Sequence, residues 1–317
     1  MQSSLSIIIP SYCRVDLLAK CLHSVHRHAP AGTQVIVVDD GSPARVVSRQ
    51  ASEWGTVHVV RLNKRRGFCA AANAGIEAAT GDIVELLNDD TVVAAGWAEA
   101  ALSAFTDHRV GAVAPLVVQR TPTGWHIDSA GDRYYVGGVA GKIGHRAPIE
   151  TITLVRRRVF GASACAAFYR RQALEQIGFF PESFHAYFED VDLSFRLNQA
   201  GYRIYFEPRS LVVHHGSASH RPGRKLLQQQ SRNEERVFWR NLPAKDLLRA
   251  LPSHLAVLVA KAWRRWQEGT LVPFLVGRLQ LLAEIPALYR YRRSRPVPVG
   301  NLDTWLVEKR FWGPTLG

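Results

Sequence analysis

The first third of the chain alternates short β-branched runs with segments of helical periodicity. Between Leu17 and Val25, apolar side chains recur at intervals that place them on one side of a helix, which can then pack on a sheet. This alternation is typical of a parallel sheet whose strands are joined by crossover helices. We therefore predict strands at residues 5–9, 34–38, 57–61, 82–87 and 110–115, with further helices within 44–54, 70–79 and 96–105.

The pattern changes after the fifth predicted strand. Residues 119–158 are rich in Gly, Tyr, Arg and Thr without a long periodicity, which predicts loops and edge hairpins over the active face. The small residues of FGASACAAFYRR, at 160–171, favour a buried strand that a ligand approaches closely. A helix at 191–200 and strands at 203–206 and 211–214 follow, and beyond residue 221 the pattern becomes helical and amphipathic.

Length and charge divide the chain into two unequal parts. Its 317 residues, 47% of them hydrophobic, suffice for one large α/β core and an appendage. Of the net charge of +13, residues 221–317 carry +11, from 18 Lys or Arg and 7 Asp or Glu, which leaves +2 for the rest. We predict an α/β domain at 1–220 and a basic helical extension at 221–317 that meets an anionic partner, with lipid and nucleic acid both open.

Cysteine spacing and apolar runs bear on the compartment. The four cysteines show no C-x-x-C pair and no metal-ligand spacing, which predicts reduced, mostly buried thiols. The first residues lack the basic and apolar regions of a signal peptide, so we expect a cytoplasmic protein. Cationic residues interrupt the apolar runs of the extension before they reach about 18 residues, and we expect no spanning helix.

Polar residues follow each of the first four predicted strands. In an open parallel sheet, ligands bind at the carboxyl ends of the strands, so these residues are expected to share one crevice. The crevice would hold an aromatic ring, several carboxylates and some cations. The residues, in chain order, are Pro10, Ser11, Tyr12 and Arg14, then Asp39, Asp40 and Gly41, then Asn63 and Lys64, then Asn88, Asp89 and Asp90.

Two of these carboxylates, Asp89 and Asp90, are consecutive and would repel each other unless a cation lies between or beside them. Oxygen ligands at a partly open site suit Mg²⁺ or Mn²⁺. The alternative is a plain turn, which Asn and Asp also favour. The chain has neither a phosphate-binding loop nor a dinucleotide-binding glycine motif, so a diphosphate would be neutralised by metal and by cations such as Arg14 or Lys64.

A second acidic cluster lies at the start of the helix predicted at 191–200, in the segment FHAYFEDVD. Acidic residues also favour helix N-termini for structural reasons alone, and that alternative stays open. Here, however, the aromatic flank would desolvate a carboxylate and raise its basicity. We therefore take Asp190 as the candidate catalytic base, with Glu189 beside it.

The pair His214 and His215 ends a predicted strand. A strand-end histidine next to a carboxylate metal site can supply a neutral nitrogen ligand. Because side chains alternate between the two faces of a strand, only one of the two can point inward. A packed or solvated pair is the alternative.

The ordered segments SIIIPSYCR, VIVVDDGS, LNKRRGFCAAANAGIEAATGDIVELLNDDT, FEDVDLSFRLNQAGYRIYFEP and VVHHGSAS resemble family 2 glycosyltransferases of the GT-A fold. The similarity is greatest to bacterial rhamnosyl- and galactofuranosyl-transferase-like enzymes, and it spans residues 5–220. The resemblance implies a Rossmann-like, mostly parallel sheet flanked by helices. It also implies an inverting enzyme that moves a sugar from a nucleotide-diphosphate donor to an acceptor hydroxyl.

Site roles follow from the resemblance. It implies that Asp90 is the principal metal ligand for Mn²⁺ or Mg²⁺, completed by His214 or, less favoured, His215, and that Asp190 is the base. Asn88 replaces the first acid of the family's D-x-D motif, which leaves Asp89 to contact ribose or metal. The nucleobase and ribose of the donor would be held by Pro10, Tyr12, Arg14 and Asp39, and the nucleotide edge of the pocket would be lined by Gly67 and Asn73.

Partners and rival functions remain to be weighed. We expect a UDP- or dTDP-sugar donor and a saccharide or lipid-linked saccharide acceptor, as used in cell-envelope polysaccharide assembly. The apolar stripe of the extension, with Trp263 and Trp266 beside Arg264 and Arg265, suits either an anionic membrane interface at the inner face of the cytoplasmic membrane or packing on the core or on a second subunit. The rivals are a catalytically silent nucleotide-sugar-binding scaffold and a nucleic-acid-binding protein; the strand-end carboxylates would repel nucleic acid.

Overall fold

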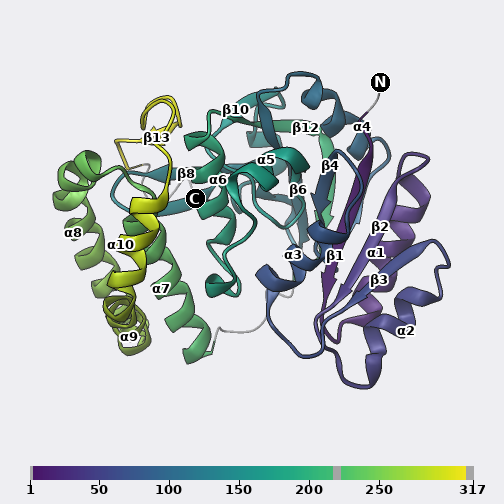
Figure 1. Cartoon of the computed structure of the whole chain (residues 1–317), viewed down its shortest axis with the longest axis horizontal. Helices are drawn as coiled ribbons and strands as arrows, with labels where there is room; N and C mark the ends of the chain where they lie inside the picture. Colours follow the sequence, from purple (N-terminus) through teal and green to yellow (C-terminus); the bar gives the residue numbers. More distant parts are fainter. Residues whose placement is uncertain (1–2, 217–222, 312–317) are drawn as a thin grey trace.

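The first half of the chain builds the parallel part of a central sheet (Figure 1). The computed structural model describes residues 3–216 and 223–311. Strands β4, β1, β2 and β3 lie side by side in that order, and each neighbouring pair is parallel. The strands and their crossover helices are β1 (Leu5–Ser11), α1 (Val15–His28), β2 (Gln34–Asp39), α2 (Val46–Ser52), β3 (Val57–Arg61), α3 (Phe68–Ala78) and β4 (Ile83–Leu86).

The second half extends the same sheet with strands of both directions. A parallel pair, β6 and β12, is joined to β4 through the short antiparallel strand β11. The expected α/β architecture with a mostly parallel central sheet is confirmed. These elements are β5 (Thr91–Val93), α4 (Trp97–Leu102), β6 (Val110–Thr121), β7 (Gly124–Ser129), β10 (Arg157–Val159), β11 (Phe168–Arg170), α5 (Arg171–Ile177), α6 (Glu189–Gln199) and β12 (Arg203–His214).

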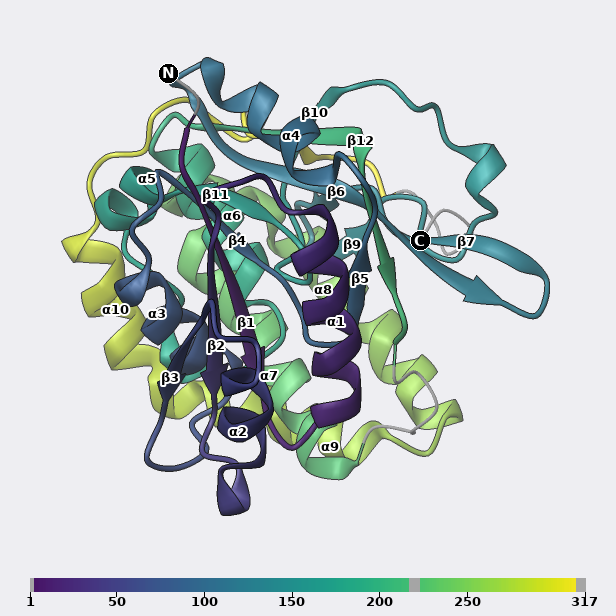
Figure 2. The same cartoon turned by 90° about the vertical axis from the view of Figure 1, so that its right-hand side faces the viewer.

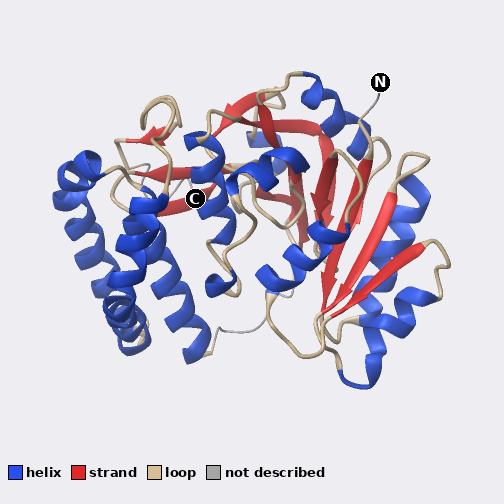
Figure 3. Cartoon of the chain, viewed as in Figure 1, coloured by secondary structure: helices blue, strands red, loops and turns tan. Residues whose placement is uncertain are grey.

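Helices cover both faces of the sheet, as the period-two pattern of its strands requires. In β1, Ile8 packs toward α3, whereas its neighbours Ile7 and Ile9 belong to the opposite core with α1 and α4. All three are fully buried. Figure 2 shows α1 in front of the strands, and Figure 3 shows the helices as layers around the sheet.

Three predicted strands differ in the structure. Residues 203–206 and 211–214 form one strand, β12, whose register against β6 shifts between Glu207 and Leu211. The predicted strand at 160–171 is a strand only at its end, in β11. The small residues before it are buried, but their backbone is irregular, and Ala164 and Cys165 line a cleft. They resemble a buried strand in sequence because they are buried, although they form no strand pairing.

The predicted hairpins between 119 and 158 are confirmed. They include β7, which pairs with β6, and the hairpin of β8 (Asp132–Tyr135) with β9 (Val139–Lys142). A third strand joins β8 from the far end of the chain, because β13 (Val307–Glu308) pairs with it in parallel. An ion pair between Arg133 and Glu308, 2.5 Å apart, fixes this junction.

The extension is helical, as expected, and packs on the α/β part. Its helices are α7 (Arg224–Asn241), α8 (Ala244–Gln267), α9 (Leu271–Gln280) and α10 (Ile285–Ser294). They stand at the end of the molecule opposite α1 and α2 (Figure 1). Val237 and Phe238 of α7 belong to the same hydrophobic core as α3 and α6. The division at residue 220 stays a prediction.

A buried ionic contact joins α6 to α7. Asp192 accepts hydrogen bonds from Arg196 Nε at 2.8 Å and from Asn241 Nδ2 at 2.9 Å, and all three residues are buried. Burial raises the pKa of Asp192, but Arg240 and Arg196 outweigh it and hold the pKa below its usual range. Removing one partner of such a pair leaves an uncompensated buried charge, so the contact ties the extension to the core.

One helical stretch of the extension differs from the expectation about spanning helices. By length and composition alone, the helical stretch Leu271–Ser294 could cross a membrane. In its most apolar 18-residue segment, 28% is buried inside the protein. In the structure, its Arg278 reaches Glu234 and Glu235 of α7. One side of this stretch therefore packs against α7 within the protein.

Close packing of α3 on β1 gives a stability prediction. A Cβ at Gly75 would lie 2.2 Å from Ile8 Cγ2 and 3.1 Å from Val38 Cγ2, inside a filled core. Gly75→Ala should therefore lower the free energy of unfolding by about 1–3 kcal/mol, which urea denaturation measures. Gly223→Ala, where nothing lies within 4 Å, is the control and should cost less than about 1 kcal/mol. Equal losses would contradict the packing argument.

Candidate active site

A cleft of 820 Å³ opens at the carboxyl edge of the sheet. Five residues predicted from the sequence line it: Arg14, Asp90, Glu189, Asp190 and His214. They come from the ends of β1, β4 and β12 and from the start of α6. Segments far apart in the chain therefore bring the predicted metal ligands and the predicted base to the same cleft.

Asp89 and Asp90 differ in what surrounds them. Asp89 accepts a hydrogen bond from Ser11 Oγ at 2.7 Å and pairs with Arg14 Nη1 at 3.0 Å, and burial raises its pKa to about 6. Asp90 pairs with Arg14 Nη2 at 2.6 Å. Burial raises the pKa of Asp90 as well, but His214 and Arg14 outweigh it and lower the pKa to about 2. Asp90 is therefore the anionic carboxylate of the pair that lines the cleft.

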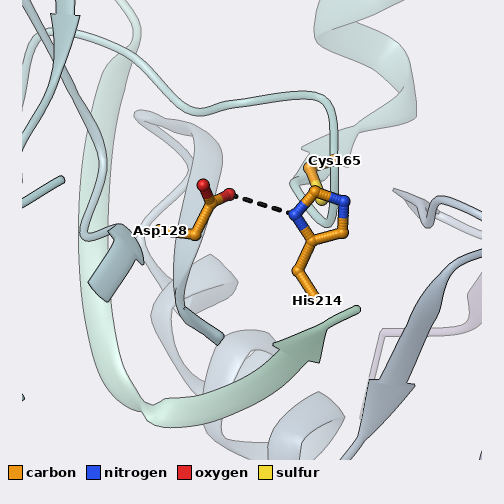
Figure 4. A group of neighbouring side chains, drawn as sticks. All are labelled: Asp128, Cys165 and His214. Atoms are coloured by element: carbon orange, nitrogen blue, oxygen red, sulfur yellow. Dashed lines mark hydrogen bonds and ion pairs between the residues drawn. The ribbon is translucent and has the colours of Figure 1, made fainter. Parts of the chain in front are cut away.

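His214 lies between two carboxylates. Its Nε2 is 3.2 Å from Asp90 Oδ1, and its Nδ1 is 3.3 Å from Asp128 Oδ2 (Figure 4). Burial lowers the pKa of His214, but Cys165, Asp128 and Asp90 raise it to about 12. His215 is exposed and does not line the cleft. The structure thus places the ring of His214 against the Asp90 carboxylate, whereas His215 contacts Asp90 through its backbone amide, which donates to the Asp90 carbonyl oxygen at 2.8 Å.

The donor set fits a divalent cation. Asp90 Oδ1 is buried and has no hydrogen-bond partner among the described residues, since the nearby His214 lacks the geometry of a hydrogen bond to it. Ligand atoms of His214, Asp128 and Cys165 lie within 4.8 Å of one another. A histidine whose second ring nitrogen faces a carboxylate is the usual arrangement of a metal ligand, because that carboxylate orients the ring. Asp128 takes that position here.

Sequence patterns did not identify Asp128 or Cys165 as site residues. Asp128 lies in β7, within the stretch that lacks periodicity, and Cys165 appeared only as a buried thiol. Lys142 Nζ pairs with Asp128 at 2.9 Å and also lines the cleft. Burial raises the pKa of Asp128, yet His214 and Lys142 hold it well below its usual range. No local motif marks these residues, because their contacts form only through the fold.

The acidic cluster at the start of α6 has the opposite electrostatics. Asp190 accepts hydrogen bonds from the amides of Ala164 at 3.2 Å and Val191 at 2.9 Å. Burial nevertheless raises the pKa of Asp190 above its ordinary value. Burial and Asp190 also raise the pKa values of Glu189 and of Asp132, a cleft residue that sequence patterns did not identify. A carboxylate with a raised pKa is a stronger base, which suits Asp190 to proton abstraction.

The loop that leads into Asp190 has a strained backbone. His185, Tyr187 and Phe188 have φ values of 60°, 71° and 68°, which lie in the left-handed region. Non-glycine residues hold this conformation only where the surroundings enforce it, and such residues concentrate at functional sites. No sequence pattern indicates this strain, because aromatic residues rarely adopt a positive φ.

Helix α7 supplies the enforcing contacts. Asn233 Nδ2 donates to the carbonyl oxygens of Phe184, Ala186 and Tyr187 at 2.8, 3.0 and 3.0 Å. Gln229 Nε2 donates to the first two of these carbonyls at 3.2 and 2.9 Å. The buried Asn233 therefore makes the extension part of the active-site framework.

Several predicted nucleotide-site residues lie outside the cleft lining, around the ends of β1 and β2. Asp39 is fully buried and accepts hydrogen bonds from Ser42 N at 2.7 Å and from Arg61 Nη1 at 2.5 Å. Burial raises the pKa of Asp39, but hydrogen bonds, chiefly from Ser48 and Ser42, lower it overall. The ring of Tyr12 lies under the guanidinium of Arg65, 4.2 Å from its centroid. Asp39 thus orders the loop after β2.

The other members of this group hold loops together or face solvent. Gly67, with φ of 92°, donates its amide to Asp40 Oδ2 at 2.9 Å. Asn73 bonds the backbone of Phe180 through both ends of its amide, at 2.8 and 2.9 Å. Pro10 is half-buried in β1 and Lys64 is exposed. Their predicted contacts with the nucleotide stay predictions.

The sheet order and the cleft at its carboxyl edge agree with the GT-A fold that the sequence motifs imply. The sequence profile of Glycosyl transferase family 2 matches residues 6–178, more than half of the chain, and the chain belongs to this family. The family that the sequence motifs indicated is thereby confirmed.

Solved structures confirm the fold. GalNAc-T7 with UDP, GalNAc and Mn²⁺ is similar with a TM-score of 0.61 at 18% identity, over 74% of this chain and 48% of that chain. The mannosyltransferase PcManGT from Pyrobaculum calidifontis, in complex with GDP-Man and Mn²⁺, is similar with a TM-score of 0.53 at 17% identity, over 93% of this chain and 88% of that chain. At these identities the likeness shows the GT-A fold alone.

Two proteins of Mycobacterium tuberculosis are similar in sequence. The pre-mycofactocin glycosyltransferase is 34% identical over 184 residues, which are 58% of this chain and 37% of that protein. The N-acetylglucosaminyl-diphospho-decaprenol L-rhamnosyltransferase is 26% identical over 292 residues, which are 81% of this chain and 94% of that protein. The match thus spans little more than a third of the first relative and nearly all of the second.

The contacts of Asn233 predict a positioning role. Asn233→Ala removes the donor that three carbonyls of the strained loop share, so the loop can relax and Asp190 loses its position. We expect the kcat for donor hydrolysis to fall about tenfold to a hundredfold while donor affinity stays within about twofold. Lys225→Ala, an exposed change on the same helix, is the control. A parallel loss of affinity, or none of kcat, would refute the role.

Proposed function

We propose that this chain transfers a sugar from a nucleotide-diphosphate donor to an acceptor hydroxyl, with inversion at the anomeric carbon. The observation that carries the proposal is the coexistence, in one cleft, of the anionic Asp90 beside His214 and of Asp190 with a raised pKa. Groups whose surroundings push their pKa values apart are suited to different tasks in one reaction. Membership of the family supports the same chemistry.

Asp190 acts as the general base in this proposal. In its ionised form it accepts the proton of the acceptor hydroxyl, whose oxygen then attacks the anomeric carbon from the face opposite the diphosphate. The bond to the diphosphate breaks as the new glycosidic bond forms, and the configuration inverts. The hydrogen bonds from Ala164 and Val191 hold the carboxylate in place. Glu189 is buried beside it, and burial together with Asp190 raises the pKa of Glu189.

Asp90 and His214 would hold the divalent cation, Mn²⁺ or Mg²⁺, and Asp128 would orient the imidazole. When bound, the cation supplies stabilisation of the negative charge that develops on the leaving phosphate oxygen. Arg14 pairs with both Asp89 and Asp90 and offsets part of their negative charge, which weakens their repulsion of an incoming diphosphate. His214 must release its proton to bind a cation, because only the neutral ring has a lone pair to offer.

The substrates are proposed from the relatives. One relative's name specifies a decaprenol-linked acceptor, and two similar structures hold UDP and GDP-Man. We favour a UDP- or dTDP-sugar as donor and a saccharide or lipid-linked saccharide as acceptor, used in glycoconjugate assembly at the cytoplasmic side of the membrane. The nucleotide roles of Pro10, Tyr12, Lys64, Gly67 and Asn73 are part of this proposal.

A calorimetric screen tests the proposal. UDP-, dTDP- and GDP-sugars are titrated into the full chain with and without Mn²⁺. We expect one nucleotide to bind, and to bind more tightly with Mn²⁺. Absence of binding by all of them would overturn the proposed function.

Substitution of the two key carboxylates should separate binding from chemistry. Asp90→Ala removes the metal ligand, so the gain in donor affinity caused by Mn²⁺ should disappear. Asp190→Asn removes the base without touching the metal side, so donor affinity should persist while turnover falls about 100- to 10,000-fold. Calorimetry measures the first effect and release of nucleoside diphosphate the second. Equal loss of donor binding in both variants would refute this division of roles.

The raised pKa of Asp190 predicts the acid limb of the pH profile. A group with a raised pKa keeps its proton to higher pH, so the base form and with it kcat/KM should rise with pH through an apparent pKa above the ordinary value of 3.8. Because Lys142 lowers the pKa of Asp190, Lys142→Met should move this limb to higher pH and Lys142→Arg should leave it in place. The coupled carboxyls titrate together, so the limb belongs to the cluster. A limb at lower pH in Lys142→Met would contradict the assignment.

A further inference from the structure

Helix α8 exposes a stripe of large apolar side chains. Successive members are three, four or seven residues apart, spacings that place them on one side of a helix, and together they run for about 27 Å along its axis. The two tryptophans contact each other, with ring centroids 4.9 Å apart. The exposed fractions are 72% for Leu248, 59% for Leu255, 71% for Val259 and 59% for both Trp263 and Trp266.

The next helices continue this exposed apolar surface. Phe274 and Gly277 are buried on the side of α9 that packs on α7, where a Cβ at Gly277 would lie 2.3 Å from the carbonyl oxygen of Gln228. The apolar side chains on the other side of α9 and on α10 take no part in that packing. They are exposed by 70% at Val272, 44% at Leu275, 62% at Leu279, 60% at Leu282, 54% at Ile285 and 59% at Tyr289.

The charge of the same helices has one sign. Residues 244–294 contain nine Lys or Arg and three Asp or Glu, which gives +6. Two of the three acids are already paired within the chain, Glu268 with Arg264 and Arg265, and Glu284 with Arg236. The exposed cations Lys245, Arg249, Arg290 and Arg293 border the apolar side chains.

This combination selects among the surfaces that could cover it. A symmetric dimer would place the same positive patch of two copies face to face, and like charges would oppose each other. An anionic bilayer, by contrast, takes up apolar side chains at its boundary, accommodates tryptophan there and attracts Lys and Arg. Singly scattered apolar residues need no partner, but a surface of this extent does.

We propose that the outer side of α8, α9 and α10, defined by the exposed residues above and called the docking surface, binds the headgroup region of an anionic lipid bilayer. The docking itself does not depend on the chemistry of the cleft. Delivery of a lipid-linked acceptor from the same bilayer rests on the proposed function. The partner is thus a lipid surface and not a second copy of the chain.

The docking surface is joined to the active site through α7. Ser231 Oγ donates to the carbonyl of Phe274 at 2.7 Å, and Arg236 Nε donates to Glu284 Oε2 at 2.8 Å. On the same helix, Asn233 holds the loop that precedes Asp190. One rigid helix therefore contacts both the docking helices and the base-bearing loop, which fixes the cleft relative to the bilayer.

Sedimentation with vesicles tests the docking surface. The full chain is mixed with vesicles of phosphatidylcholine alone or with added phosphatidylglycerol, at low and at high salt. We expect binding to the anionic vesicles only, weakened by salt. The triple variant Leu255→Glu, Val259→Glu and Trp263→Glu should partition at least about tenfold less, because each change removes apolar burial and adds a repelled charge.

A matched control separates this surface from general exposure. Leu154→Glu with Val155→Glu changes two residues that are 56% and 59% exposed. They precede Arg156, which donates a hydrogen bond to Ser103 directly after α4, and α4 lies across the molecule from α8 (Figure 1). This double variant should bind vesicles as the wild type does. Donor binding, measured by calorimetry with Mn²⁺, should be unchanged in both variants, since none of these residues lines the cleft.

Each outcome decides the proposal. Failure to bind anionic vesicles, or equal binding by the triple variant, overturns docking even if donor binding persists, in which case the proposed function survives. Docking without any donor binding would support the surface and sink the proposed function. A concentration-dependent dimer in analytical ultracentrifugation that the triple variant abolishes would identify a chain–chain interface instead. Retention after alkaline carbonate extraction of bound vesicles would show insertion and also overturn surface docking.

Discussion

Compensation of buried carboxylates is the constraint on which the cleft depends. Asp90 and Asp128 are almost fully buried, and a buried ionised group costs several kcal/mol unless it is paired. The fold supplies Arg14 from one side, Lys142 from another, and His214 between the two. Under the proposed mechanism, Asp90 and His214 would hold a divalent cation, and that cation would supply positive charge where a diphosphate brings negative charge.

The acidic cluster at the start of α6 is only partly compensated, because the amides of Ala164 and Val191 and the cation of Lys142 lower the pKa of Asp190 by less than burial raises it. Glu189 Oε2 is buried without a hydrogen-bond partner among the described residues, and Asp132 and Asp190 share its surroundings. A carboxyl group in that position holds its proton more tightly, whereas Asp90, among cations, gives it up readily. Under the proposed function, identical side chains would serve as ligand and as base because nearby cations outweigh the effect of burial on the pKa in one case and not in the other.

Sequence patterns predict the features of the fold and site that depend on neighbouring residues, but not those that depend on contacts between distant residues. Periodicity is local, so β3 begins and ends where the pattern predicted, and Asp90, Asp190 and His214 could be picked from strand ends and a helix start. The choice between His214 and His215 needed the register of β12, in which His214 lies opposite Thr91 of β5. Strand alternation alone allowed either residue.

Other site residues could not be predicted because their partners are distant in the chain. Asp128 meets His214 across 86 residues, and Asn233 meets Ala186 across 47. Neither has a local motif, and an asparagine within a basic amphipathic helix gives no sign that it bonds three carbonyls. The irregular run before β11 differs from the predicted strand for a related reason. Small buried residues are typical of a strand that pairs with its neighbours, but here the amide of Ala164 donates a hydrogen bond to Asp190 instead.

The extension is an integral part of the fold, because it shares a core and a sheet with the α/β part. Phe238 of α7 lies fully buried in the core shared with α3 and α6, and β13 returns to complete the small sheet beside the cleft. An appendage joined only by a flexible linker could bind a membrane without affecting the geometry of the site. A bundle that shares a core, and whose first helix also bonds the strained loop, can hold the cleft at one height and one tilt over a docked bilayer. On the proposed docking, the basic charge of the extension thus acts on orientation as well as on attachment.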